Sequence, residues 1–349
     1  MGTTAKRAAV VTLVAGSIVV AAIALWKIRV VIALFFLGII IAAAMRPGVE
    51  WLQKRARLPR AAGVLVHYAA LAGVIALFLW LVVPPAIDQV QQAIGSSGLH
   101  HAATHSSGIK HEILSGIDKR LRRLPSGSSL FHPAVTVTKT AFEVLVGIFF
   151  TFAVAAYWIF ERDDLIAVVQ SLAPPKQRRV VHDTWILIDQ KLGAFVRGEL
   201  ILVVLVAAIL CGGFSAIGLP YWILVGSFAG VFELVPVIGP LVAGGLAIGV
   251  GLTQSPLKAL AAGLIVLAVR LTEDYVVIPR VLGHATGLSP LAVLVSVSAV
   301  GILFGGFYVL LAIPVAAVVA TLVDVIVRDV DPAAQEVPAV LFAGTKEES

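Results

Sequence analysis

The residue whose type and position best suit chemistry is Glu233, which lies inside an apolar run of the sequence. A carboxylate at membrane depth is costly, and it usually faces a partner or a water-filled cavity. The same run carries Pro236, Gly239 and Pro240, which interrupt helical hydrogen bonding. Lipid tolerates such a break only where the backbone is buried in protein or lines water. An acid on a broken helix therefore predicts a substrate- or ion-binding site of the kind found in secondary transporters.

Two roles are open for Glu233. As a functional group it binds a cation or carries a proton, and as a structural group it caps a helix or pairs with Arg197 or Arg270. Pro236 and Pro240 are expected to end one half-helix and to open the next. The N-terminus of that second half-helix then points its positive dipole end into a cavity, where it suits electronegative solute atoms.

Further charged residues stand near the ends of two predicted helices. Arg270 closes an apolar stretch, and Glu273 and Asp274 follow it at the spacing of one helical face. Both an internal ion pair and a position at the lipid headgroups fit this pattern. Arg197 and Glu199 allow the same two interpretations. All five residues join Glu233 in the predicted substrate- or ion-binding site.

Histidines gather in the polar stretch 84–139, at His100, His101, His105, His111 and His132. His101 and His105 would share a helical face, so a weak metal site or a pH sensor is conceivable. No acid or cysteine stands in register with them, so we expect solvated histidines and no metal site. His111-Glu112 lacks the second histidine of a zinc protease motif, and no nucleotide-binding glycine motif occurs. The sequence therefore predicts no enzyme and no cofactor.

The composition is that of a membrane protein. Apolar residues make up 59% of the 349 residues and charged residues only 13%, against roughly 25% in soluble domains. The net charge of +6 does not indicate nucleic acid, because the cations gather between the apolar runs, as topology signals do. Their distribution places the N-terminus in the cytoplasm.

The hydropathy pattern predicts an all-α integral membrane protein with about eight membrane elements. Continuous spans are expected near residues 8–26, 30–45, 63–83, 140–160, 200–218 and 256–272. The first run is too long for a signal peptide, so we expect it to be retained. The predicted organisation is a helical scaffold over 1–83, an extracytoplasmic segment of amphipathic helices over 84–139, a transport core over 140–330 and a disordered tail over 331–349.

Two longer apolar regions, 221–252 and 288–327, are each broken near the middle and share a layout. Gly-Leu-Pro opens the first region, and Gly-Leu-Ser followed by Pro290 opens the second. Gly305 and Gly306 break the second region, and Pro314 follows them. Paired, interrupted segments predict two broken or re-entrant hairpins, with Pro290, Gly305, Gly306 and Pro314 as hairpin and hinge residues.

Small residues recur at helical spacing in both arms of the first predicted hairpin. Gly226 and Gly230 lie in one arm, and Gly245 and Gly249 lie in the other. Glycines at this spacing let helix backbones approach closely in lipid. We expect both pairs to serve packing.

Several stretches of the C-terminal half match one family. They are Phe195-Val196-Arg197-Gly198-Glu199, the run from Glu233 to Pro240, the run from Thr272 to Gly283, Gly287-Leu288-Ser289-Pro290 and the run from Ala312 to Ala317. With them the chain resembles the autoinducer-2 exporter family of bacterial transporters over nearly its whole length. The resemblance implies a multi-pass inner-membrane homo-oligomer that exports a signalling furanone or a related metabolite. Some relatives are described as sodium/proton antiporters.

Two positions depart from the pattern of that family. Glu199 stands where glutamine is common, and Tyr308 stands where a second hairpin glycine is common. The first change could alter the coupling ion or the charge of the substrate. The second could narrow the tip of the hairpin.

Three functions remain open at this point. The favoured one is a secondary exporter of small polar solutes that works by alternating access and is coupled to an ion. The second is a sodium/proton antiporter that uses Glu233 with Glu199 or Asp274, and the third is a passive oligomeric channel. The expected partners are the lipid bilayer, a small solute or ion, and further copies of the chain; nucleic acid is not among them.

Overall fold

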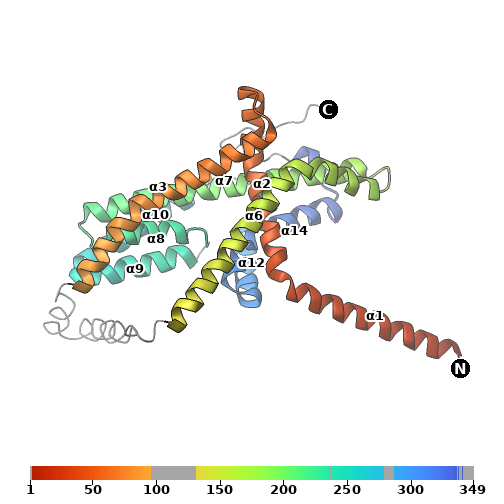
Figure 1. The fold of residues 1–349 in the computed structure, drawn as a ribbon, viewed down its shortest axis with the longest axis horizontal. Coiled ribbons are helices and arrows are strands. Elements are labelled where there is room, and N and C mark those ends of the chain that lie inside the picture. The colour runs from red at the N-terminus through yellow and green to blue at the C-terminus, as the bar shows by residue number, and fades with distance from the viewer. Residues whose placement is uncertain are drawn as a thin grey trace.

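A computed structural model describes residues 2–95, 131–235, 238–278 and 287–335, together with 337 and 340. Every regular element within these ranges is helical (Figure 1). The elements are α1 Gly2–Lys27, α2 Arg29–Ala56, α3 Arg60–Gly95, α6 Phe131–Leu172, α7 Arg178–Ala216, α8 Trp222–Phe232, α9 Ile238–Gln254, α10 Pro256–Thr272, η2 Glu273–Val277, α12 Pro290–Phe304, α13 Gly306–Val309, α14 Ala312–Ile326 and η3 Pro332–Ala334. The predicted all-α class is confirmed for the described part of the chain.

Five of the described helices are long and apolar enough to cross a membrane. They contain the segments Val10–Lys27, Arg29–Ala56, Arg60–Pro85, Lys139–Leu172 and Arg178–Ala216. Five of the six predicted spans fall on these helices. The sixth, 256–272, has the bounds of α10, but its 17 residues fall short of that length. Four further helices, α8, α9, α12 and α14, are apolar but shorter than the five long ones. The chain is a multi-pass membrane protein.

Helix α7 is the element on which the others are assembled. It packs against α2, α6, α8, α10, α14 and η3. One core cluster joins α7 to α8, α9 and α10 through Phe214, Val225 and Ala247. Another joins α7 to α2 and the second apolar region through Leu192 and Leu311. The centre of the fold is therefore the long helix that precedes the first predicted hairpin.

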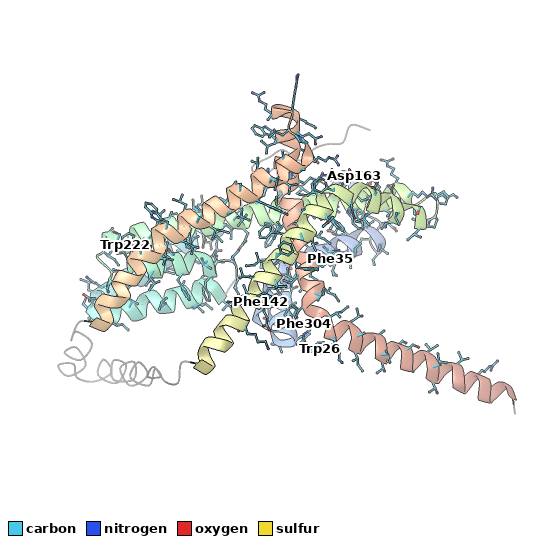
Figure 2. The ribbon with its side chains drawn as sticks, viewed as in Figure 1. Trp26, Phe35, Phe142, Asp163, Trp222 and Phe304 are labelled. Atoms are coloured by element: carbon cyan, nitrogen blue, oxygen red, sulfur yellow. The ribbon has the colours of Figure 1, made fainter. Side chains whose placement is uncertain are left out.

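Helices α1 and α3 stand largely outside this core. In Figure 1, α1 extends away from the other helices toward the N-terminus. None of the apolar window of α1 or of α3 is buried by the chain itself. The end of α1 is anchored where Trp26 lies 5.8 Å from Phe304 between ring centroids (Figure 2). Lipid or another copy of the chain must cover these two helices.

Both predicted breaks are present. In the first region α8 ends at Phe232 and α9 begins at Ile238. In the second region α12 ends at Phe304. The next residue, Gly305, has a φ of +99°, which favours glycine because it has no Cβ. Pro290 is the first residue of α12, and Ser289 caps that helix by accepting from the Ala292 N–H at 3.2 Å. Gly306 opens α13, and buried Pro314 lies in the first turn of α14.

The two glycine pairs behave differently. A Cβ at Gly226 would lie 2.6 Å from Cys211 Sγ, and one at Gly230 would lie 2.5 Å from the Cβ of Ala207. This pair lets α8 approach α7, so the packing role is confirmed. An added Cβ at Gly245 or Gly249 meets nothing within 4 Å. The predicted packing is wrong for that second pair, because its face of α9 has no neighbour among the described residues.

The predicted extracytoplasmic segment 84–139 lies mostly outside the described residues. Helix α3 continues to Gly95 and α6 begins at Phe131. The side chain of His132 and all of His100, His101, His105 and His111 fall outside the described part.

The tail differs from its predicted disorder where the structure describes it. We call Asp331–Gln335 with Val337 and Val340 the C-terminal segment; it packs on α7 through η3. Lys191 Nζ donates to Thr321 Oγ1 at 3.1 Å and to Gln335 Oε1 at 2.9 Å. Arg197 Nε donates to the Val340 carbonyl at 2.9 Å. The physical reason is that two buried cations of α7 need acceptors, which the C-terminal segment supplies.

We predict that Arg197→Leu releases the C-terminal segment. A hydrogen bond to a charged donor contributes about 1.5–3 kcal/mol, and Arg197 makes such bonds to Val340, Ala43 and Ala44. The expected result is a lower midpoint of thermal unfolding and protease cleavage after residue 330. The control is Arg178→Leu, which removes an exposed arginine from the same helix. Equal protease resistance in the two variants would contradict the prediction.

Candidate functional site

The first break places Glu233 directly after α8. Its backbone N–H donates to the carbonyls of Ala229 and Gly230, so it still belongs to the last helical turn. Val235 N–H then donates to Phe232 O at 2.9 Å, which turns the chain away from the axis of α8. The Glu233 side chain is buried. The local sequence thus delivers a carboxylate at the point where the helix stops.

Gly239 lets α9 start against the end of α8. Its N–H donates to Val235 O at 2.8 Å. A Cβ at Gly239 would overlap the carbonyl oxygen of Phe232. Pro240 lies in the first turn of α9, where its missing N–H has no helical partner to lose. Pro236, predicted to end the first half-helix, lies outside the described residues.

Arg270 at the end of α10 binds three carboxylates. Its Nη1 lies 3.3 Å from Glu233 Oε1 and 3.6 Å from Glu273 Oε2. Its Nη2 lies 2.8 Å from Asp274 Oδ1. Of the two interpretations that the helical spacing left open, the structure therefore contains the ion pairs. The pairing of Glu233 with Arg270, left open by the sequence, is present as well.

A stretch of π-helix begins within this group. Residues Glu273–Val277 form η2, which follows α10 without a break. π-Turns are rare, and they occur frequently at functional sites because they displace side chains from the α-helical register. Nothing in the local sequence indicated this element.

Glu273 is the most deeply buried acid of the group. Its side chain is 4% exposed, and its Oε1 atom has no hydrogen-bond partner among the described residues. It lines a cavity of about 270 Å³ between α7 and α10, whose other walls include Leu205, Ile209 and Ile265. A buried carboxylate oxygen without a donor is costly, so this atom is suited to hold a proton.

Glu199 reaches the same group from α7. It lies close enough to Glu233 and Glu273 for their negative charges to repel one another. No ion pair joins Glu199 to a cation within the described ranges. We call Glu199, Glu233, Arg270, Glu273 and Asp274 the acidic cluster. With four carboxylates and one guanidinium it has a surplus of negative charge unless protons or a cation neutralise it.

The structure does not bring Arg197 into the acidic cluster. Its guanidinium donates instead to the carbonyls of Ala43 and Ala44 in α2 and of Val340. The second break joins the first through apolar packing rather than charge. Val235 packs on the core cluster of Val297, Val309 and Ala312, which belongs to α12, α13 and α14. The helices that touch the tip of the first break, α12 to α14, therefore contain or adjoin the predicted hinge residues Pro290, Gly305, Gly306 and Pro314.

A second polar group was missed by sequence reasoning. Asp189 of α7 lies 3.3 Å from Arg46 Nη1 of α2 and 3.3 Å from Arg162 Nε of α6. Arg46 is one of the cations between the second and third apolar runs, and these cations were expected only as topology signals. Because 143 residues separate Arg46 from Asp189, no local spacing could have revealed the contact.

Comparison of the sequence with known proteins identifies the family of the chain. The family model described as AI-2E family transporter matches residues 15–328. The chain belongs to the AI-2E family of transporters. The transporter is 24% identical over 293 residues to "Putative transport protein YrrI" of Bacillus subtilis (strain 168), which covers 81% of this chain and 82% of that protein. It is 25% identical over 308 residues to "Putative transport protein MT0215" of Mycobacterium tuberculosis (strain CDC 1551 / Oshkosh), covering 83% and 82%. The family is one of transporters and not of enzymes.

We predict that Gly239→Ala prevents the transporter from forming the first break. The added Cβ would collide with a backbone carbonyl, which cannot move aside as a side chain can. The expected result is a large loss of folded, monodisperse protein, measured by fluorescence-detected size-exclusion chromatography. Gly245→Ala on the same helix is the control, since a Cβ there meets open space. Normal yield of both variants would show that the turn differs from the one described.

We predict that Arg270→Met destabilises the transporter and that a second change, Glu233→Gln, restores part of the loss. Removing one partner of a buried ion pair costs about 3–5 kcal/mol, and less here because the Arg270 side chain is 32% exposed. The double variant has one uncompensated carboxylate fewer. The measurement is the midpoint of thermal unfolding in detergent, with Arg328→Met as the exposed control. Additive losses in the double variant would argue against a shared ion pair.

Proposed function

We propose that this chain is a secondary transporter of the inner membrane that exports small polar solutes by alternating access, with the acidic cluster as its coupling site. The single observation that carries the proposal is the meeting of three carboxylates with one arginine at a break between apolar helices, with Glu199 close enough to interact electrostatically with two of them. Acids at membrane depth are retained where they bind or move an ion.

The lengths of the short helices support two re-entrant hairpins. At 1.5 Å per residue, the 11 residues of α8 extend about 16 Å and the 17 residues of α9 about 26 Å. Neither length crosses about 30 Å of hydrocarbon, so the turn between them would lie within the membrane. Counting α8–α9 and α12–α14 as one hairpin each, the five long helices and α10 give eight elements. The distribution of cations supports a cytoplasmic N-terminus.

The contacts at the two breaks support a mechanism. While Glu233 is ionised, Arg270 holds the tip of α8–α9 against α10. Protonation of the carboxylates would weaken this contact, and the tip would be free to move together with α12–α14, on which Val235 packs. Gly305 supplies the backbone freedom for a hinge.

The arrangement fits a proton better than a metal cation as the coupling ion. Within the described residues no group of three or more acids, histidines or cysteines is spaced to hold a metal ion. Arg270 occupies the position between the carboxylates that a cation would need. A sodium/proton antiporter remains the second candidate, because the unpartnered Oε1 of Glu273 suits proton exchange without an organic solute. The exposed faces of α1 and α3 are open to lipid or to further copies of the chain, and a homo-oligomer would bury part of them. A passive oligomeric channel is the third candidate.

The test is Glu233→Gln in proteoliposomes that contain a pH-sensitive dye, paired with metabolite profiling of the medium of expressing cells. Glu143→Gln is the matched control, because Glu143 is an exposed acid on α6. We expect gradient-driven flux of Glu233→Gln to fall to that of empty vesicles, while the control keeps wild-type flux. Sodium-driven proton movement without solute export would favour the antiporter. Unchanged flux in Glu233→Gln would remove this residue from coupling.

A further inference from the structure

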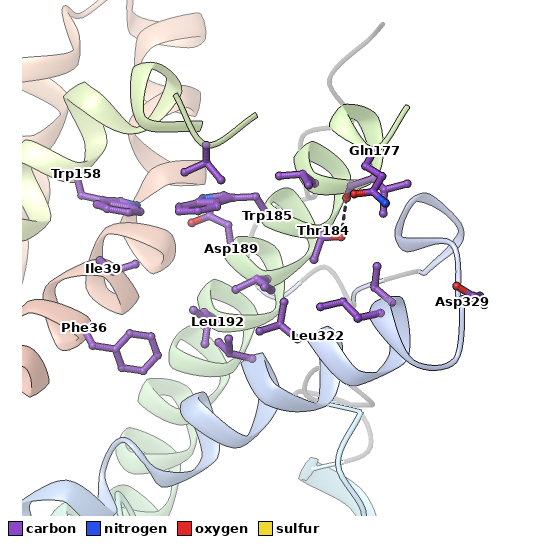
Figure 3. A pocket seen from close by; sticks show the side chains of 17 residues that line it. Phe36, Ile39, Trp158, Gln177, Thr184, Trp185, Asp189, Leu192, Leu322 and Asp329 are labelled. Carbon is purple, nitrogen blue, oxygen red and sulfur yellow. Dashed lines mark hydrogen bonds between the residues drawn. The ribbon is translucent and has the colours of Figure 1, made fainter. Parts of the chain in front are cut away.

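A larger cavity lies apart from the acidic cluster, between α2, α6, α7 and α14 (Figure 3). Its volume of about 810 Å³ falls within the roughly 300–1,000 Å³ of small-molecule sites. Apolar side chains such as Phe36, Leu192 and Leu322 form most of its walls. No residue of the acidic cluster lines it.

One end of the cavity is aromatic. Figure 3 shows the indole rings of Trp158 and Trp185 side by side, and their centroids lie 6.0 Å apart at an interplanar angle of 17°. Phe35 packs edge-on against Trp158 at 6.3 Å. The Nε1 atom of Trp158 is buried and has no acceptor in the described part of the chain. Such rings form a flat apolar wall that suits another planar ring.

The same end carries polar groups that are not all satisfied. Asp189 lines the cavity, and its Oδ2 atom forms ion pairs with both Arg46 and Arg162. The Arg162 side chain is 4% exposed, and its Nη2 atom has no hydrogen-bond partner among the described residues. Arg162 does not itself line the cavity, whereas Trp158 does. An unpartnered buried donor is costly, and a ligand oxygen that accepts from Trp158 Nε1 would relieve that cost.

The charged side chains at this end are ion-paired. The ion pairs between described residues join three arginines with three acids: Arg46, Arg60, Arg162, Glu50, Asp163 and Asp189. An ionic ligand would lose its hydration on entry between walls that are mostly apolar. A hydrocarbon chain would leave the Trp158 Nε1–H unpaired. The chemistry therefore favours an uncharged ring that carries an oxygen.

We propose that this cavity is a second binding site, which takes an uncharged aromatic small molecule with a hydroxyl or carbonyl oxygen. The ring lies against Trp158 and Trp185, and the oxygen accepts from the unpartnered Nε1–H of Trp158. Because α14 forms one wall and α7 another, an occupied site ties the second hairpin to the central helix. The site is independent of ion coupling at the acidic cluster.

The test uses 2-naphthol as the probe and calorimetric titration of the full-length transporter in detergent micelles. We expect saturable binding that Trp185→Leu weakens at least about tenfold, since it removes the stacked wall. Leu322→Trp should abolish binding by filling the cavity. The matched controls are Trp51→Leu on α2 and Val319→Trp on α14, whose side chains are exposed and lie outside the lining. Partition into micelles is the same for all five proteins, so it cancels in the comparison.

Three probes that differ from 2-naphthol in charge or in the hydroxyl oxygen test which ligand chemistry the cavity prefers. Naphthalene, 2-naphthoate and 2-naphthylmethylammonium should each bind more weakly than 2-naphthol. Equal binding of naphthalene, or of any probe by Leu322→Trp, would overturn the proposal. A phospholipid that copurifies with the wild type and is lost from Leu322→Trp would instead identify an acyl-chain site. A smaller assembly of Leu322→Trp in size-exclusion chromatography would identify an interface between copies.

Discussion

The guanidinium of Arg270 is the contact on which the arrangement of the first hairpin depends. Glu233, Glu273 and Asp274 have apolar surroundings, and without a counter-charge they would have to become protonated or move to water. Arg270 binds all three, which fixes the end of α10 against the turn after α8. The close approach beside it is possible because Gly239 has no Cβ to overlap the carbonyl oxygen of Phe232. Charge neutralisation and backbone geometry thus support each other at one position.

Helix α7 is the second constraint, because it carries two buried cations as well as Glu199. Lys191 and Arg197 need acceptors, and they find them on α2, on α14 and on the C-terminal segment. Those bonds hold the second hairpin and the chain end to the helix that also packs against α8. A movement of either hairpin is therefore a movement relative to α7.

The two polar centres of the transporter differ in charge balance, and this separates what each can do. The acidic cluster has more carboxylates than cations, so its state depends on protons or another ion. Around Asp189 the ion pairs between described residues join three arginines with three acids, and they border an apolar cavity. One centre is suited to respond to an ion gradient, and the other to hold an uncharged molecule.

The sequence by itself determined the helical class, the positions of the long apolar helices and the two breaks. These follow from local causes: runs of apolar residues, prolines that lack an N–H, and glycines that allow special backbone angles. The pairing of Arg270 with Glu273 and Asp274 was also local, since residues three and four apart share a helical face.

Only the tertiary structure decided which distant residues meet. Glu233 binds Arg270 37 residues away, Arg197 binds backbone carbonyls rather than an acid, and Asp189 joins α7 to α2 and α6. The π-turn at Glu273 and the packed C-terminal segment left no sequence signal. Local spacing fixes the face of a helix on which a residue lies. Which helix covers that face is settled by the packing of the whole chain, and no short stretch of sequence contains that information.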